Sequence, residues 1–130
     1  SFLTKSFHFL IFTVLYALDG YDEISLTGAT KAFSQNSERV LTPQDFGVLP
    51  LAANEIAGGD SVESSAAIFM NVIQNKGTQA QTQVVCANAG MAIATALNLT
   101  PMEGFEKAKE SLESGNALSA LQKLQNLSKA

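Results

Sequence analysis

The apolar run at residues 7–18, FHFLIFTVLYAL, constrains the fold of this chain more than any other feature. It is shorter than the roughly 20 apolar residues that a helix needs to cross a bilayer. It is rich in Phe, Ile, Val and Tyr, and an Asp-Gly turn at residues 19–20 ends it. No small-residue cleavage site precedes that turn, which disfavours a secretory signal segment. We therefore expect a core strand that is buried on both faces in a parallel sheet.

Short β-type segments and a helical turn follow the Asp-Gly turn. Residues 24–33 and 38–41 have strand-like composition, and the polar segment SQNS at 34–37 separates them. This arrangement predicts a hairpin or two edge strands joined by a polar turn. The next segment, TPQDF at 42–46, places a threonine before a proline and an aspartate three residues after that threonine. It predicts a short helical turn.

From residue 60 onward the pattern is helical. Asp60 and Glu63 are the expected capping pair of the first helix, and Gly77 is its expected stop. The expected helices run from Asp60 to Lys76, from Thr78 to Leu97, from Thr100 to near Gly115, and from an Asn116 cap into a leucine-rich C-terminal segment. The second helix is rich in Ala and Gly, so we expect it to pack closely against a neighbour.

The order of elements indicates an α/β fold that is short of strands. A chain of 130 residues is large enough for one domain with a single core, and 46% apolar residues is an ordinary globular composition. One strand, two short strands and four helices do not supply the parallel neighbours that a buried strand needs. We therefore predict the C-terminal portion of a mixed-sheet α/β domain with several helices packed on it, and we expect part of the sheet to lie upstream.

Charge and the rare residue types exclude several functions. The net charge is −4 and the eight basic residues are scattered singly, so neither nucleic acid nor a membrane is an expected partner. Cys86 is the single cysteine and lies among small apolar residues, which predicts an inert buried thiol and favours a reducing compartment. His8, the single histidine, lies in FHFLIF with no nucleophile or acid nearby, so we expect a structural role.

Two adjacent acids, Asp22 and Glu23, follow the Asp-Gly turn. Mg²⁺ takes oxygen ligands, and proteins usually hold it through one or two carboxylates together with substrate phosphates. In open α/β sheets, ligands bind beyond the carboxyl ends of the strands, where these acids are expected to lie. Adjacent acids in a solvated loop can also be plain surface polarity, and the residues alone leave both interpretations open.

Other motifs are weaker. The segment GGDSVES at 58–64 is expected to be a capped transition from loop to helix, because Asp60 and Glu63 occupy the free N–H groups that an anion would need; it can still form one wall of a site. Nucleophile-elbow, Walker-type and HExxH motifs are all missing from the sequence, so no catalytic residue is predicted.

Four blocks in the same order resemble the C-terminal part of the anthranilate phosphoribosyltransferase family. They are DGYDEISLTGATK, LTPQDFG, GGDSVESSAAIF and QVVCANAGMAIA, and the ending SGNALSALQKL is also similar. The resemblance covers roughly residues 12–130 and implies a C-terminal part of the phosphoribosyltransferase α/β domain there, with a lead-in at residues 1–11. Members of this family combine a small helical domain with an α/β domain, so the resemblance implies that the N-terminal helical domain lies outside this sequence.

The resemblance also implies an activity. The family transfers the phosphoribosyl group of phosphoribosyl pyrophosphate to anthranilate, with release of pyrophosphate, in tryptophan biosynthesis. It implies a cytoplasmic homodimer, and Mg²⁺ as cofactor held by Asp22 and Glu23. The family's GTGGD phosphate loop and its anthranilate-binding residues are missing from these 130 residues. The substrate-binding residues are therefore unknown, and we expect the isolated fragment to be inactive.

Departures from the family pattern leave two other interpretations open. Tyr16 stands where a histidine is common in the family, and Ser64 or Ser65 replaces a usual asparagine. The chain is alternatively a non-catalytic relic or interaction fragment, which binds a partner through the surface that the missing half normally covers. It is also similar to the related pyrimidine nucleoside phosphorylases, although DGYDEISLTG favours the anthranilate enzyme.

Overall fold

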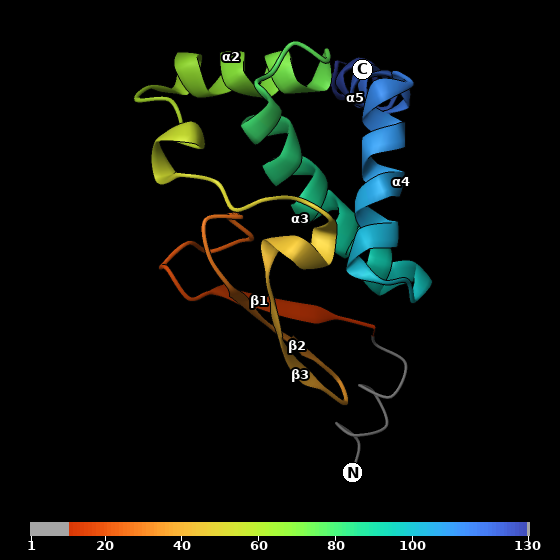
Figure 1. Cartoon of the computed structure of the whole chain (residues 1–130). Coiled ribbons are helices and arrows are strands. Elements are labelled where there is room, and N and C mark those ends of the chain that lie inside the picture. The colour runs from red at the N-terminus through yellow and green to blue at the C-terminus, as the bar shows by residue number, and fades with distance from the viewer. Residues whose placement is uncertain (1–10, 130) are drawn as a thin grey trace.

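The computed structural model describes residues 11–129 and combines a small sheet with a layer of helices (Figure 1). The strands are β1 (Thr13–Ala17), β2 (Thr30–Ser34) and β3 (Glu38–Leu41), and two short 3₁₀ helices follow, η1 (Pro43–Phe46) and η2 (Ala53–Glu55). The α-helices are α2 (Val62–Ile73), α3 (Gln79–Leu97), α4 (Pro101–Glu113) and α5 (Asn116–Ser128). The predicted α/β class is confirmed.

The described sheet is antiparallel throughout, in the order β1-β2-β3. The hairpin predicted for β2 and β3 is confirmed, with Phe33 opposite Glu38 next to the turn. The prediction for β1 was wrong within the described residues, since β1 pairs antiparallel with β2 and buries only one face. The outer face of β1 carries Val14 and Tyr16, which are apolar but exposed. Because of them, a strand that is buried on one face has the composition of a strand that is buried on both. Residues 7–10 of the apolar run, with His8, lie outside the described residues.

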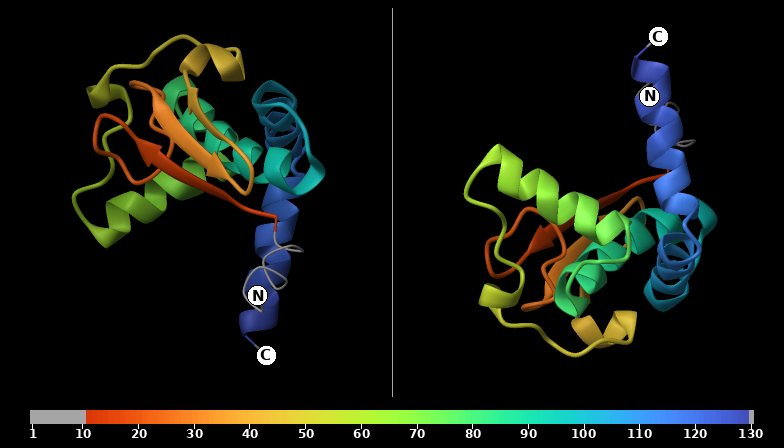
Figure 2. Two further views of the ribbon diagram at one scale, coloured as in Figure 1. Left: turned by 90° about the horizontal axis from the view of Figure 1, so that it is seen from below. Right: turned by 90° about the horizontal axis from the view of Figure 1, so that it is seen from above.

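Helix α3 packs on the sheet and is the centre of the core. Figure 2 shows it crossing behind the strands, and the hydroxyls of Thr13 in β1 and Thr95 in α3 are hydrogen-bonded at 2.7 Å. The buried cluster joins the loop after β1, the sheet, η1 and helices α2 to α4. Its members are Ile24, Leu26, Ala32, Leu41, Phe46, Val72, Cys86, Ala87, Met91, Phe105, Ala108 and Leu112.

Two glycines allow α3 and α4 to meet without side chains between them. A Cβ added at Gly104 would lie 2.1 Å from the carbonyl oxygen of Gly90, and one added at Gly90 would lie 2.6 Å from the backbone of Phe105. The expectation that the small-residue helix packs closely against a neighbour is therefore confirmed. Helix α4 is that neighbour, and the two axes turn by 116° at the break between them.

Two of the four predicted helix starts, at Thr78 and Thr100, are confirmed by capping hydrogen bonds. The amide of Gln81 donates to the Thr78 hydroxyl at 3.1 Å, and the amide of Glu103 donates to the Thr100 hydroxyl at 3.2 Å. The predicted turn after β3 is the 3₁₀ helix η1. These hydrogen bonds occupy N–H groups that have no partner inside the helix.

The ends of α2 and the start of α5 differ from the prediction. Ser61, rather than Asp60, caps α2, because its hydroxyl accepts from the amide of Ser64. The helix ends at Ile73, before the predicted Lys76 and the expected stop at Gly77, and Asn75 takes the left-handed conformation at φ 62°. At α5 the cap is Gly115, and Asn116 is already the first helical residue.

Helix α5 extends away from the rest of the molecule, as Figure 2 shows. None of its described residues is fully buried, and Leu124 and Leu127 are exposed. Within residues 11–129, no single helix has both the length and the apolar composition to span a membrane; α3 and α4 meet the test only when taken together across their 116° bend.

Candidate functional site

The loop between β1 and β2 carries both acids predicted to bind metal. Asp22 and Glu23 are exposed, just beyond the carboxyl end of β1. The next three residues, Ile24 to Leu26, are buried to 2% exposure or less. The loop therefore presents two adjacent carboxylates to solvent from a segment that is anchored in the core.

Asn88 in α3 makes the first of these anchors. Its side-chain oxygen accepts from the amide of Ile24 at 2.9 Å, and its side-chain nitrogen donates to the carbonyl of Ile24 at 2.8 Å. The same nitrogen donates to the carbonyl of Val84 at 3.0 Å, one helical turn earlier. The Asn88 side chain thus satisfies both backbone polar groups of Ile24, the buried residue that follows Glu23. Burying these two groups without hydrogen-bond partners would cost free energy.

Asp19 makes the second anchor, on the other side of the acids. Its carboxylate accepts from the hydroxyl of Ser25 at 3.3 Å and from the hydroxyl of Thr27. The two hydroxyls are also hydrogen-bonded to each other at 2.8 Å. Asp19 therefore closes the loop on itself.

Leu26 fixes the loop through its backbone and its side chain. It has φ 62°, a left-handed conformation that costs a non-glycine residue about 1–3 kcal/mol. Its side chain is 1% exposed and its carbonyl accepts from the amide of Leu51 at 2.9 Å. Burial and this hydrogen bond offset the strain, so the loop has one well-defined path.

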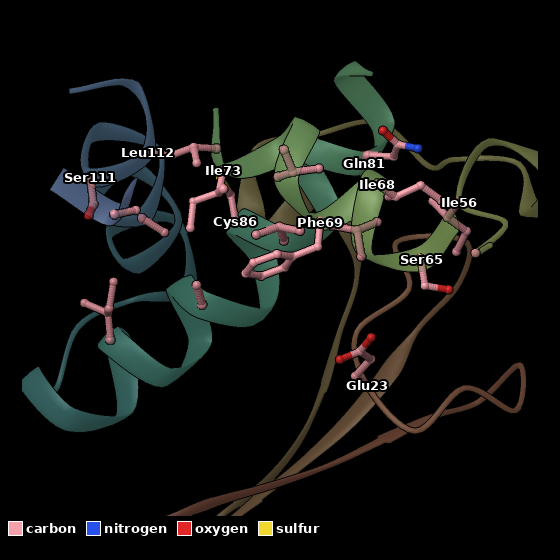
Figure 3. Close-up of a pocket in the computed structure, with 18 of the residues that line it drawn as sticks. Glu23, Ile56, Ser65, Ile68, Phe69, Ile73, Gln81, Cys86, Ser111 and Leu112 are labelled. Carbon is pink, nitrogen blue, oxygen red and sulfur yellow. The ribbon is translucent and has the colours of Figure 1, made fainter. Parts of the chain in front are cut away.

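An apolar cavity of about 440 Å³ lies beside this loop, between α2, α3 and α4. Figure 3 shows Glu23 and Ser65 together at one end and Ser111 with Leu112 at the other. The double-glycine loop reaches the same space through Gly58, so the segment expected to form one wall of a site does line the cavity that contains Glu23. The lining residues are Glu23, Ile56, Ala57, Gly58, Ser65, Ile68, Phe69, Val72, Ile73, Gln81, Val84, Val85, Cys86, Ala89, Ile93, Ala108, Ser111, Leu112 and Ala117.

The acids fit a magnesium ion that is shared with a phosphate ligand. Within residues 11–129, no group of three or more His, Cys, Asp or Glu side chains is placed to hold a metal by itself. Magnesium, however, usually keeps several waters and takes only one or two carboxylates together with substrate phosphates. The exposed pair Asp22 and Glu23 is a donor set of this kind.

The remaining candidates, Asp60 and Cys86, have structural roles. Asp60 accepts from the hydroxyl of Ser64 at 3.3 Å, at the start of α2. Cys86 is buried, and burial raises the pKa of its thiol above the usual 9.0, with a smaller contribution from the negative charge of Glu113. Such a thiol is a poor nucleophile, because the thiolate is the reactive form. The prediction of a buried core cysteine is confirmed.

Our sequence interpretation missed the two anchoring side chains. Asn88 is a polar residue within an otherwise small and apolar stretch of α3, and that contrast was an available signal. Asp19 was assigned only to the turn. The partner of Asn88 was not visible in the sequence, since it lies 64 positions away, whereas the partners of Asp19 lie only 6 and 8 positions away.

The chain is similar to known proteins both in sequence and in fold. A family model described as glycosyl transferase family, a/b domain, matches residues 6–118. The anthranilate phosphoribosyltransferases of Christiangramia forsetii and Flavobacterium johnsoniae are 64% and 59% identical over 117 residues. This match covers 90% of the chain but 35% and 36% of those relatives, so the chain spans about a third of their length.

Solved structures show the same fold. Anthranilate phosphoribosyltransferase from Thermus thermophilus matches with a TM-score of 0.81 at 24% identity, over 91% of this chain and 36% of that chain. The enzyme from Saccharomyces cerevisiae in complex with PRPP and Mg matches with a TM-score of 0.75 at 23% identity, over 85% of this chain and 32% of that chain. The resemblance found in the sequence is confirmed.

Proposed function

This chain belongs to the glycosyl transferase family, a/b domain, and from that premise we propose that it is the C-terminal α/β part of an anthranilate phosphoribosyltransferase. The observation that carries the proposal is 64% identity over 117 residues to a relative of that name. In the whole enzyme, the amine of anthranilate forms a C–N bond to the ribose carbon of phosphoribosyl pyrophosphate while the C–O bond to pyrophosphate breaks, and the amine loses one proton to water. The division into a lead-in at residues 1–11 and the α/β part at 12–130 remains a prediction.

Asp22 and Glu23 are the residues that we propose hold Mg²⁺. When bound, the ion neutralises negative charge on the departing pyrophosphate. The residues of this chain contribute by presenting two exposed carboxylates at the end of β1, on a loop anchored through Ile24 and Leu26. The yeast structure that shares this fold is a complex with PRPP and Mg, which supports Mg²⁺ as the ion.

The transfer needs no protein nucleophile. Cys86 is buried with a raised pKa, which suits a structural role. Positioning of the two substrates and neutralisation of the leaving group supply the catalysis in a direct displacement. The groups that hold anthranilate and the remaining phosphates come from the part of the enzyme outside this chain.

We also propose that the whole enzyme is a cytoplasmic homodimer, as the resemblance to its family implies, and that its remaining part packs on β1. Apolar side chains remain uncovered along β1 and its flanks, which is unusual for a complete domain and fits a surface that the rest of the enzyme covers. They are Ile11, Phe12, Val14, Tyr16 and Leu18.

A chimeric enzyme tests the proposal. The matched C-terminal segment of the Christiangramia forsetii enzyme is replaced by the corresponding 117 residues of this chain, and formation of phosphoribosyl anthranilate is measured by fluorescence. We expect Mg²⁺-dependent turnover. A chimera that folds and dimerises but has no activity would refute the enzyme assignment and favour the alternative of a non-catalytic relic.

The acids are tested in the same chimera. Asp22→Asn combined with Glu23→Gln is expected to lower turnover by on the order of 100-fold without changing the melting temperature. The matched control is Glu106→Gln with Glu110→Gln, two exposed acids of α4 that lie outside the loop. Full activity of the first double variant at limiting Mg²⁺ would refute the metal assignment.

A further inference from the structure

We propose that Asn88 is a positioning residue for the metal-binding acids, and that its side chain sets the affinity of the site for divalent cations. The inference rests on the proposed function, because it assumes that Asp22 and Glu23 hold the cation. It concerns a residue on a different element, since Asn88 lies in the middle of α3.

The contact falls on the backbone next to Glu23. The amide of Ile24 belongs to the peptide unit that joins Glu23 to Ile24, and this amide donates to Asn88 at 2.9 Å. The carbonyl of Ile24 accepts from Asn88 at 2.8 Å. Two hydrogen bonds to consecutive peptide planes hold the direction in which the chain leaves Glu23, and therefore the direction of its side chain.

Asparagine is suited to this position because it both donates and accepts. Its amide carries one acceptor oxygen and two donor hydrogens. The oxygen accepts from Ile24, and the nitrogen donates to the carbonyls of Ile24 and Val84. The hydrogen bond to Val84 fixes the Asn88 side chain on its own helix, so this side chain is held both at the helix and at the loop.

Asp22 and Glu23 need a loop that is held in place, because their carboxylates repel each other. Asp22 and Glu23 are adjacent, like-charged and exposed, so a free loop would hold their carboxylates apart or in many orientations. A cation binds more tightly when its ligands are already held together, because less ordering remains to be done on binding. Groups that orient metal ligands in this indirect way typically change metal affinity by about 10–100-fold when they are removed.

The test compares three variants of the full-length chimera. Asn88→Ala removes both hydrogen bonds to Ile24. Asn88→Gln keeps the amide but displaces it by one methylene, and it serves as the milder variant if the alanine variant does not fold. Thr95→Val is the matched control, because it removes a bond from the same helix to β1, at 2.7 Å, far along α3 from the loop.

Two measurements do not require an active enzyme. Hydrogen–deuterium exchange, followed by mass spectrometry on the peptide that contains residues 18–30, reports whether Ile24 is held. Electron paramagnetic resonance of free Mn²⁺, at a fixed concentration of inorganic pyrophosphate and compared with the same titration without protein, reports cation affinity. We expect Asn88→Ala to speed exchange in this peptide and to weaken Mn²⁺ binding by about tenfold or more, and Asn88→Gln to have a smaller effect of the same sign. Thr95→Val should change neither quantity.

A third measurement concerns turnover. In Asn88→Ala, the Mg²⁺ concentration for half-maximal rate is expected to rise by about tenfold, while the KM for anthranilate stays within about twofold. Unchanged Mn²⁺ affinity in Asn88→Ala, or an equal loss in Thr95→Val, would overturn the positioning role. If the unsubstituted chimera is inactive but binds Mn²⁺, the proposed reaction is refuted. The positioning role of Asn88 is then still decided by hydrogen–deuterium exchange and Mn²⁺ affinity. If Mn²⁺ binding is itself unaffected by loss of both acids, the inference fails as well.

Discussion

Replacing Gly104 by alanine tests the close crossing of α3 and α4. The new Cβ would lie 2.1 Å from the carbonyl oxygen of Gly90, well inside the 3.0 Å that real Cβ contacts essentially never cross, and 3.0 Å from the Cβ of Ala94. The first obstacle is backbone, so it cannot rotate away and the helices must separate by about 1 Å. That movement loosens the contact of Phe105 with the core.

The two energy terms oppose each other. Overpacking of this kind costs about 3 kcal/mol at the upper end of the usual range, whereas alanine in place of glycine within a helix gains about 1 kcal/mol. The net expectation is a loss of about 2 kcal/mol, which would lower the melting temperature by roughly 4–8 °C in a domain of about 150–250 residues.

Thermal unfolding of the chimera, followed by circular dichroism, measures the effect. The matched control is Gly58→Ala, where an added Cβ meets nothing within 4 Å. This control is expected to change the free energy of unfolding by less than about 1 kcal/mol. A Gly104→Ala protein that melts at or above the temperature of the parent would show that the helices do not meet as closely as the structure describes.

Two further predictions concern Cys86 and Asp19. Burial raises the pKa of the Cys86 thiol, so we expect this thiol to react with a disulfide reagent at pH 8 only after unfolding. Because the fold favours the protonated thiol over the thiolate, the stability that the buried thiol contributes is present below the pKa of the unfolded thiol. This stability is lost as the pH rises above about 9. Rapid labelling of the folded protein would contradict this. Asp19→Ala removes the acceptor of the Ser25 and Thr27 hydroxyls and is expected to destabilise the protein by about 1 kcal/mol, with Asp19→Asn in between because it keeps one acceptor oxygen. Equal melting temperatures for all three proteins would argue against that network.

Local features of the sequence predicted much of the secondary structure. The caps at Thr78 and Thr100 and the hairpin around residues 34–37 were predicted correctly, because their signals lie within three or four residues of one another. The start of α2 was placed one residue early, since Asp60 and Ser61 are both good caps and only the backbone path decides between them. The pairing of β1 was predicted wrongly because it depends on a strand that lies 13 residues further on.

The sequence by itself determined the α/β class, the positions of the helices, the resemblance to the phosphoribosyltransferases and the adjacent acids at 22 and 23. Only the tertiary structure decided what holds those acids in place. Asn88 and Ile24 are 64 residues apart, and they meet because α3 packs on the loop after β1. Hydrogen bonds of this kind depend on the path of the whole chain, whereas a cap or a turn depends on neighbours alone.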